Sequence, residues 1–226
     1  FLHRAALLAE FANTASKFAT LAHTGQSLLM NTAATTNSTA DAIVIGGGAA
    51  GLSAALMLGR ARRSVVVVDA GAPRNRFADH VHGVLGHDGR PPAELLGLGR
   101  DEVQAYGVEI VRARAIGARA LGDRVEVELD DGTTIAARAV ILTTGIVDEL
   151  PAIEGLRERW GRTVLHCPYC HGWEVRDARL GVIATSPQSV HQAELVRQWS
   201  DRVTFFAATA ADALDHDART RLSARG

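Results

Sequence analysis

The chain has 226 residues, of which 47% are hydrophobic and 22% charged, and its formal net charge is −1. This composition is typical of a globular protein with one large domain or two small ones. The 24 basic and 25 acidic residues are interspersed, and no apolar run reaches the roughly 18 residues needed to span a bilayer. We therefore expect a soluble protein with no nucleic-acid and no membrane partner. Two cysteines are too few for a secreted disulfide framework, so a cytoplasmic location is expected.

Residues 1–40 are predicted to form a non-core extension and linker. Residues 31–40 are rich in Thr, Asn and Ala and show no apolar periodicity. Because the chain begins with Phe1 and Met30 directly precedes the linker, we expect the natural start near Met30.

A dinucleotide-binding pattern begins at residue 41. An apolar strand at 42–45 leads into G-x-G-x-x-G, then into a helix at 52–61 and a second strand at 64–69 that ends in an acid. The first glycine permits a tight turn, the second lets the backbone approach a pyrophosphate, and the third lets the helix pack closely on the strand. The helix N-terminus offers N–H groups to phosphates, and the acid can bind an adenosine ribose. The predicted site comprises Gly46, Gly48, Ala49, Ala50, Gly51 and Asp69.

The next segment favours FAD over NAD. A long Gly/Pro/His-rich excursion follows residue 71, where an NAD domain would continue directly into its next helix. A helix near 92–106 and a strand at 108–111 come next, followed by a β-hairpin of 124–129 with 133–135. A buried strand then ends at Thr143, Thr144 and Gly145.

These motifs, in this order, resemble the thioredoxin-reductase-like flavoproteins over residues 41–206. The resemblance implies an α/β fold, with a Rossmann-type FAD-binding domain at 41–150 that is discontinuous in the family. The start of a second, Rossmann-like pyridine-nucleotide domain is expected at 151–226. By resemblance, the glycine turn binds the ADP half of FAD, and the segment from Thr144 to Pro151 marks the crossing to the second domain. Further expected cofactor contacts are Arg74, Asn75, His82, Thr144 and Gly145.

Both cysteines lie in the stretch H-C-P-Y-C-H at 166–171. By resemblance, Cys170 exchanges electrons with the flavin, Cys167 attacks the sulfur of the substrate, and His171 is the proton donor and acceptor. The expected partner is a thioredoxin-like protein or a small-molecule dithiol, and the resemblance allows a homodimer.

Other interpretations of this stretch stay open. C-x-x-C-H is formally a haem-attachment signature, two cysteines with two histidines could ligate zinc, and the cysteines could be a buried inert pair. We expect no metal, because His166 and His171 adjoin the cysteines instead of forming a distant ligand pair. The tryptophans Trp160, Trp173 and Trp199 are expected in the core.

Residues 179–208 depart from the reductase pattern. They again predict strand, turn, helix and strand, but Ala184, Ser186 and Ser189 stand where glycines are expected. A Cβ at these points obstructs a pyrophosphate, and no basic cluster follows the second strand. These substitutions make NADPH binding doubtful. In lacking a pyridine-nucleotide site, the chain resembles the dithiol-oxidase branch of the family, which passes electrons to oxygen.

The chain ends at Gly226, inside the second domain and before the segment that returns to the FAD domain in this family. It is expected to be a fragment or a decayed form. Three hypotheses follow: an enzyme of thioredoxin-reductase type, an oxygen-using dithiol oxidase, and an inactive flavin-binding remnant.

Overall fold

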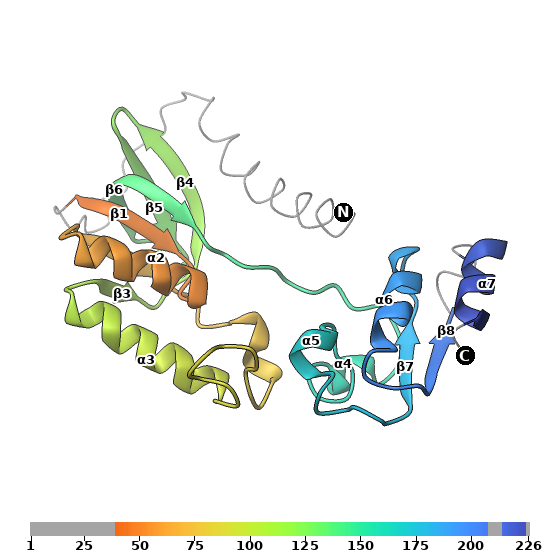
Figure 1. The fold of residues 1–226 in the computed structure, drawn as a ribbon. Helices are drawn as coiled ribbons and strands as arrows, with labels where there is room; N and C mark the ends of the chain where they lie inside the picture. The colour runs from red at the N-terminus through yellow and green to blue at the C-terminus, as the bar shows by residue number, and fades with distance from the viewer. Residues whose placement is uncertain (1–38, 208–213, 225–226) are drawn as a thin grey trace. The chain divides into compact units, whose positions relative to one another are not determined.

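The computed structural model describes residues 39–207 and 214–224 (Figure 1). These residues divide into two compact units: the first unit holds residues 39–76 and 91–147, and the second unit holds residues 77–90 and 148–224. The extension predicted at 1–40 lies outside the described residues except for its last two, and Ala40 already belongs to the first strand. The predicted division at residue 150 stays a prediction for the intact protein, and we note that the loop Phe77–Arg90 groups with the second unit.

The first unit contains a six-stranded sheet in the order β3-β2-β1-β6-β5-β4 (Figure 1). Strands β1, β2, β3 and β6 are parallel, and β5 and β4 continue the sheet in antiparallel pairing. Helix α2 connects β1 to β2, and α3 connects β2 to β3, as parallel neighbours require. The bounds are β1 (Ala40–Ile45), α2 (Ala49–Arg60), β2 (Val65–Val68), η1 (Arg74–Phe77), α3 (Pro92–Ala105), β3 (Glu109–Val111), β4 (Ala115–Leu121), β5 (Arg124–Leu129) and β6 (Thr134–Leu142).

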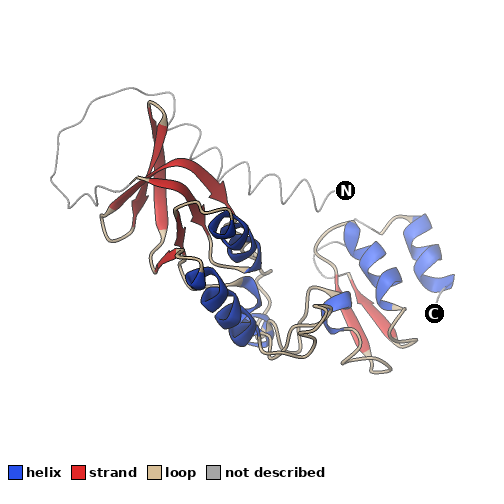
Figure 2. Ribbon diagram, turned by 60° about the vertical axis from the view of Figure 1, so that its left-hand side comes forward, coloured by secondary structure: helices blue, strands red, loops and turns tan. Residues whose placement is uncertain are grey.

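Both faces of the parallel strands are covered. Alternate residues of β2, Val65 and Val67, pack with Val44, Leu52 and other residues of α2 and α3 on one face. The remaining residues of β2 pack with Ile43, Ile45 and residues of the β4–β5 hairpin on the other face. Burial on both faces explains why these strands read as continuous apolar runs, and Figure 2 shows the helices on one side of the sheet. The predicted Rossmann-type α/β fold is confirmed.

The second unit is built on a parallel pair of strands, β7 (Leu180–Ile183) and β8 (Val203–Phe206), connected by α6 (Gln188–Val196). The predicted strand, turn, helix and strand are thus confirmed. Helix α7 (His216–Ala224) contacts α6 through an ion pair in which Arg221 Nε lies 3.1 Å from Glu194 Oε1. Two one-turn helices precede this pair of strands, α4 (Leu156–Arg159) and α5 (Pro168–His171).

The predicted hairpin is confirmed, since β5 pairs with β6 in antiparallel register. The segments expected separately at 133–135 and before residue 143 are one strand, β6, and only Ala137 of it is fully buried. Strand β4 was not predicted, because its sequence AIGARAL is mostly small residues without clear alternation. None of the helices described is long and apolar enough to cross a membrane.

Candidate active site

The glycine turn joins β1 to α2 at the carboxyl ends of the parallel strands. Gly46 has φ +113°, a region that favours glycine, and a Cβ on it would collide with the carbonyl oxygen of Thr143. A Cβ on Gly51 would collide with the carbonyl oxygen of Gly46 and lie 2.7 Å from Thr143 Oγ1. The fold itself therefore requires glycine at Gly46, for the turn, and at Gly51, for the close approach of the helix.

Gly48 is different, because the fold does not explain it. Its φ is −78°, which every residue adopts, and no described atom lies within 4 Å of the position that a Cβ would occupy. The space beside Gly48 is thus open at the N-terminus of α2, whose first turn carries no acid and begins with the exposed Ala49 and Ala50. Free N–H groups and open space at a helix N-terminus are what a pyrophosphate needs.

Two residues of this turn were missed by the sequence analysis. Thr143 lies directly after β6. Its hydroxyl donates to the carbonyl oxygens of Ile45 and Gly46, which lie 2.9 Å and 3.0 Å from Oγ1. Gly47 is buried, and a Cβ on it would lie 2.5 Å from Cγ of Asp69. The unbroken Gly46–Gly48 run was the available signal for Gly47. No sequence signal pointed to Thr143, because the family motif matched its neighbours Thr144 and Gly145 instead. Both neighbours are exposed in the structure.

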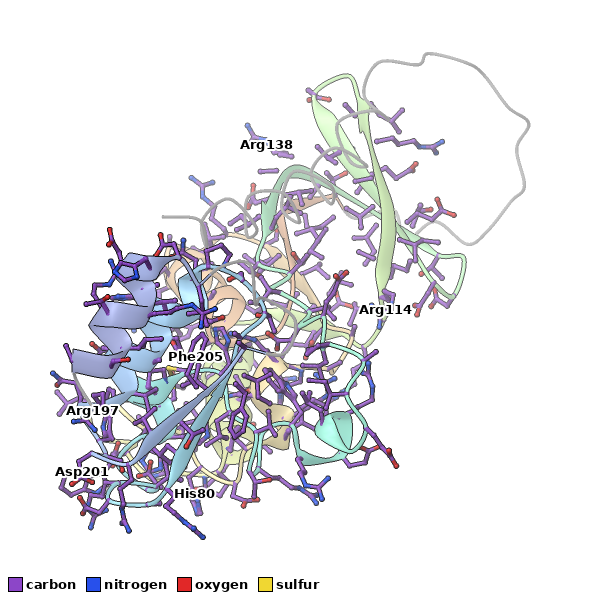
Figure 3. The ribbon with its side chains drawn as sticks, turned by 90° about the vertical axis from the view of Figure 1, so that its right-hand side faces the viewer. His80, Arg114, Arg138, Arg197, Asp201 and Phe205 are labelled. Atoms are coloured by element: carbon purple, nitrogen blue, oxygen red, sulfur yellow. A yellow bond between two sulfur atoms is a disulfide. The ribbon has the colours of Figure 1, made fainter. Side chains whose placement is uncertain are left out.

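Asp69 lies at the end of β2, as predicted, and is half-buried. Its Oδ1 accepts a hydrogen bond from the backbone N–H of Gly71 at 3.0 Å. A shallow cavity of about 220 Å³ opens beside it. Arg114, which leads into β4 (Figure 3), is one of the lining residues. The cavity is lined by Asp69, Ala70, Gly71, Arg112, Ala113, Arg114 and Asp130. A carboxylate at the end of the second strand, next to an open glycine turn, is the arrangement that hydrogen-bonds the ribose in dinucleotide-binding folds.

The remaining predicted cofactor residues fall in two places. Arg74 and Asn75 are exposed on η1, in the first unit. His82 belongs to the second unit, where its Nδ1 lies 3.4 Å from Asp88 Oδ2 and its Nε2 lies 3.5 Å from Glu174 Oε1. The backbone N–H of Gly83, and after it the His82 ring, hold the pKa of the Asp88 carboxyl below its usual range. The structure thus ties His82 to the segment that follows the cysteine pair.

The cysteine pair is a disulfide at the beginning of α5. Cys167 precedes the helix and Cys170 lies one turn along it, with their Cα atoms 5.3 Å apart. Cys167 is half-buried and Cys170 exposed, so the pair is not fully buried. His171 follows directly, and its Nδ1 is buried without a hydrogen-bond partner among the described residues. Among all the residues that the structure describes, no three His, Cys, Asp or Glu side chains lie close enough together to hold a metal ion.

In the turn after β7, a serine side chain accepts the backbone hydrogen bonds that a dinucleotide-binding turn would donate to a phosphate. Ser189 is buried, and its Oγ accepts hydrogen bonds from the backbone N–H groups of Thr185 (3.1 Å) and Ser186 (3.4 Å). These are N–H groups of the kind that a dinucleotide-binding turn offers to its ligand. The missing glycine was evident from the sequence, whereas this internal hydrogen bonding was not.

One unit thus carries a glycine turn that fits a dinucleotide, and the other carries an accessible Cys-x-x-Cys disulfide. These features define the class of dinucleotide-dependent disulfide oxidoreductases. The chain belongs to the pyridine nucleotide-disulphide oxidoreductase family, whose sequence profile matches residues 40–225. FAD is the cofactor that this family implies.

Several known proteins are similar to this chain. Thioredoxin reductase tcpT of Claviceps purpurea is 36% identical over 185 residues, which cover 76% of this chain and 56% of that protein. Thioredoxin reductase sirT of Leptosphaeria maculans is 35% identical, over 76% of this chain and 57% of that protein. Among solved structures, HlmI is 49% identical with a TM-score of 0.80, over 84% of this chain and 61% of HlmI. The predicted resemblance to thioredoxin-reductase-like proteins is confirmed, and the chain spans less than two thirds of each of these relatives.

Proposed function

We propose that this protein is a FAD-dependent thiol–disulfide oxidoreductase whose reacting group is the Cys167–Cys170 disulfide. The observation that carries the proposal is this disulfide at the first turn of α5, followed at once by His171, in a chain of this family. Two cysteines on one helical turn can open and close their bond with little movement of the backbone. The substrate is a thiol or disulfide: a thioredoxin-like protein, as the names of the relatives suggest, or a small-molecule dithiol, as the sequence resemblance implies.

The proposed reaction with a dithiol has two exchange steps. One substrate thiolate attacks Sγ of Cys167, which forms a mixed disulfide and releases Cys170 as a thiolate. The second substrate thiol attacks the mixed disulfide, so the substrate leaves as a disulfide and Cys167 is released. The substrate loses two electrons and two protons, and the opened cysteine pair has gained the two electrons. His171 takes up and returns the protons, because imidazole ordinarily titrates near neutral pH.

The residues that would hold FAD are those of the glycine turn around Gly48, with Asp69 at the ribose. When bound, FAD supplies two-electron exchange with the cysteine pair. The remaining tasks belong to side chains of this protein: Cys167 and Cys170 carry the sulfur chemistry, and His171 moves protons at the site.

A second candidate, the oxygen-using dithiol oxidase, is favoured by one observation. The N–H groups of Thr185 and Ser186 are already hydrogen-bonded to Ser189 Oγ, so they are not available to a nucleotide phosphate. The Cβ atoms of Ala184 and Ser186 add a steric obstacle in the same turn. Without NADPH, electrons would enter from the dithiol substrate and leave to oxygen.

We expect His171→Ala to lower dithiol turnover of the intact protein by roughly a hundredfold, because a general acid–base group is removed. The FAD content and the disulfide should be unchanged. Anaerobic bleaching of the flavin absorbance by dithiothreitol or reduced thioredoxin measures the rate and does not depend on the final electron acceptor. His191→Ala, at an exposed histidine of α6, is the matched control. A wild-type rate in His171→Ala would remove the histidine from the mechanism.

The oxidase candidate predicts that micromolar NADPH does not bleach the flavin absorbance of the wild-type protein. Ser189→Gly releases the N–H groups of Thr185 and Ser186 and should strengthen NADPH binding by roughly tenfold, about the effect of one charge-assisted hydrogen bond. Ser189→Thr keeps the hydroxyl and should bind as the wild type does. Isothermal calorimetry measures the binding. Rapid, saturable bleaching of the wild-type protein by NADPH would support the reductase candidate and reject the oxidase.

A further inference from the structure

The helix that carries Cys170 depends on its neighbours for its position. Helix α5 has only four residues, and a helix of one turn is not stable alone. Gly172, which follows it, is buried, and a Cβ there would lie 2.6 Å from Cδ2 and 2.7 Å from Cε2 of Trp199. The indole of Trp199 therefore packs directly against the backbone at the end of α5.

Trp199 makes a second contact with the same helix. Its ring meets the ring of Tyr169 edge-on, at 88° and with 5.3 Å between centroids, and Tyr169 stands between the two cysteines in sequence. Such an edge-to-face pair is a favourable aromatic geometry. Trp199 thus contacts the residues on both sides of Cys170, namely Tyr169 and the turn at Gly172.

The position of Trp199 is itself fixed by the backbone. Its N–H donates to the carbonyl oxygen of Val196 at 3.0 Å, and its carbonyl oxygen accepts from Asp177 N–H at 2.8 Å. From the preceding helix α6, Gln192 Nε2 donates to the carbonyl oxygen of His166 at 3.2 Å, just before Cys167. All these residues belong to the second unit. Helix α6 and the turn after it therefore hold the Cys-x-x-Cys segment at both ends.

We infer that Trp199 is a positioning residue for the cysteine pair. By holding the backbone from Tyr169 to Gly172, it keeps the Cα atoms of Cys167 and Cys170 at disulfide distance when the bond is open. Closing the bond then costs less conformational entropy, because the turn is already formed. The consequence is a thermodynamic preference for the disulfide. The inference rests on the proposed function, since it concerns the same redox pair.

The test is the equilibrium of the pair with glutathione. The two cysteine thiols become one S–S bond as glutathione disulfide takes up two electrons and two protons and leaves as two molecules of glutathione. The intact protein is equilibrated at fixed glutathione ratios, its free thiols are alkylated, and mass spectrometry counts them. This readout requires no turnover.

Trp199→Leu keeps most of the apolar volume but loses the flat contact with Gly172 and the ring pair with Tyr169. We expect its equilibrium constant for disulfide formation to fall by about tenfold, which corresponds to about 30 mV. Trp199→Phe should restore most of the wild-type value, because an aromatic ring is kept. The matched control is Trp173→Leu. Trp173 is 66% exposed and its ring contacts Arg176, so the disulfide equilibrium of this variant should equal that of the wild type.

An unchanged equilibrium in a folded Trp199→Leu protein overturns the inference, whatever its turnover. If that variant does not fold, Tyr169→Leu carries the test, because it removes the ring pair with Trp199 at an exposed position of α5. A wild-type equilibrium in folded Tyr169→Leu would equally overturn it. Failure of the proposed function would look different: the wild-type protein would show no dithiol turnover, while its thiol–disulfide equilibrium would remain measurable.

Discussion

Replacement of Gly48 by valine should abolish the retention of FAD by the intact protein and leave the folding stability of the flavin-free protein nearly unchanged. The physical reason is the contrast within one turn. At Gly48 the backbone is in an ordinary conformation, and the space where a side chain would stand is open. A branched side chain there fits the protein but occupies the place of a pyrophosphate. Flavin absorbance of the purified variant, together with thermal unfolding, measures both effects.

Two other glycines supply the controls. Gly51→Ala should destabilise the protein, because its Cβ meets the carbonyl oxygen of Gly46 and has no room to move. Gly97→Ala, at a helical glycine of α3 with open space around it, should change neither the flavin content nor the fold. Equal flavin content in Gly48→Val and wild type would contradict the assignment of the turn to FAD.

The first unit was predictable because each of its signals is local. The strand, glycines, helix, strand and acid from residue 41 to Asp69 form one continuous segment, so the pattern can be recognised without knowledge of distant contacts. Gly46 and Gly51 have these roles in the structure. The remaining glycine, Gly48, was predicted to adjoin a ligand; the space beside it is open, and its role stays a prediction.

Other features of the first unit arise from contacts between segments far apart in sequence. Thr143 joins β6 to the glycine turn across almost a hundred residues, and a lone threonine at a strand end carries no signal of that contact. Strand β4 forms because β5 offers it an edge and its Ala118 packs in the core, although its own sequence has little strand preference.

In the second unit, the sequence predicted the elements but not the local hydrogen bonds. The absence of glycine at Ser189 was visible, yet the acceptance of two turn N–H groups by its hydroxyl follows only from the placement of α6. Likewise, Trp199 was expected as an ordinary core residue, and its contact with the redox helix depends on the fold. Trp173, also expected in the core, is instead 66% exposed and covered by Arg176, so that prediction was wrong.

The largest effects are expected for the cysteines themselves. Cys167→Ser and Cys170→Ser should each lower dithiol turnover by roughly a thousandfold or more, because neither variant can form the internal disulfide. The two variants should differ in what they accumulate. In Cys170→Ser, Cys167 attacks glutathione disulfide, releases one glutathione and retains the other as a mixed disulfide, since no resolving thiol remains. Mass spectrometry detects this adduct and the residue that carries it.

Cys167→Ser should form the adduct much more slowly, because the remaining thiol, Cys170, is assigned to the cofactor side. Exposure alone would favour the opposite result, since Cys170 is the more exposed of the two in this structure. The experiment therefore separates an assigned role from simple accessibility. The double serine variant, which has no thiol, is the control for non-specific modification. Faster adduct formation in Cys167→Ser than in Cys170→Ser would exchange the roles of the two cysteines, and full turnover in both variants would end the redox assignment of the pair.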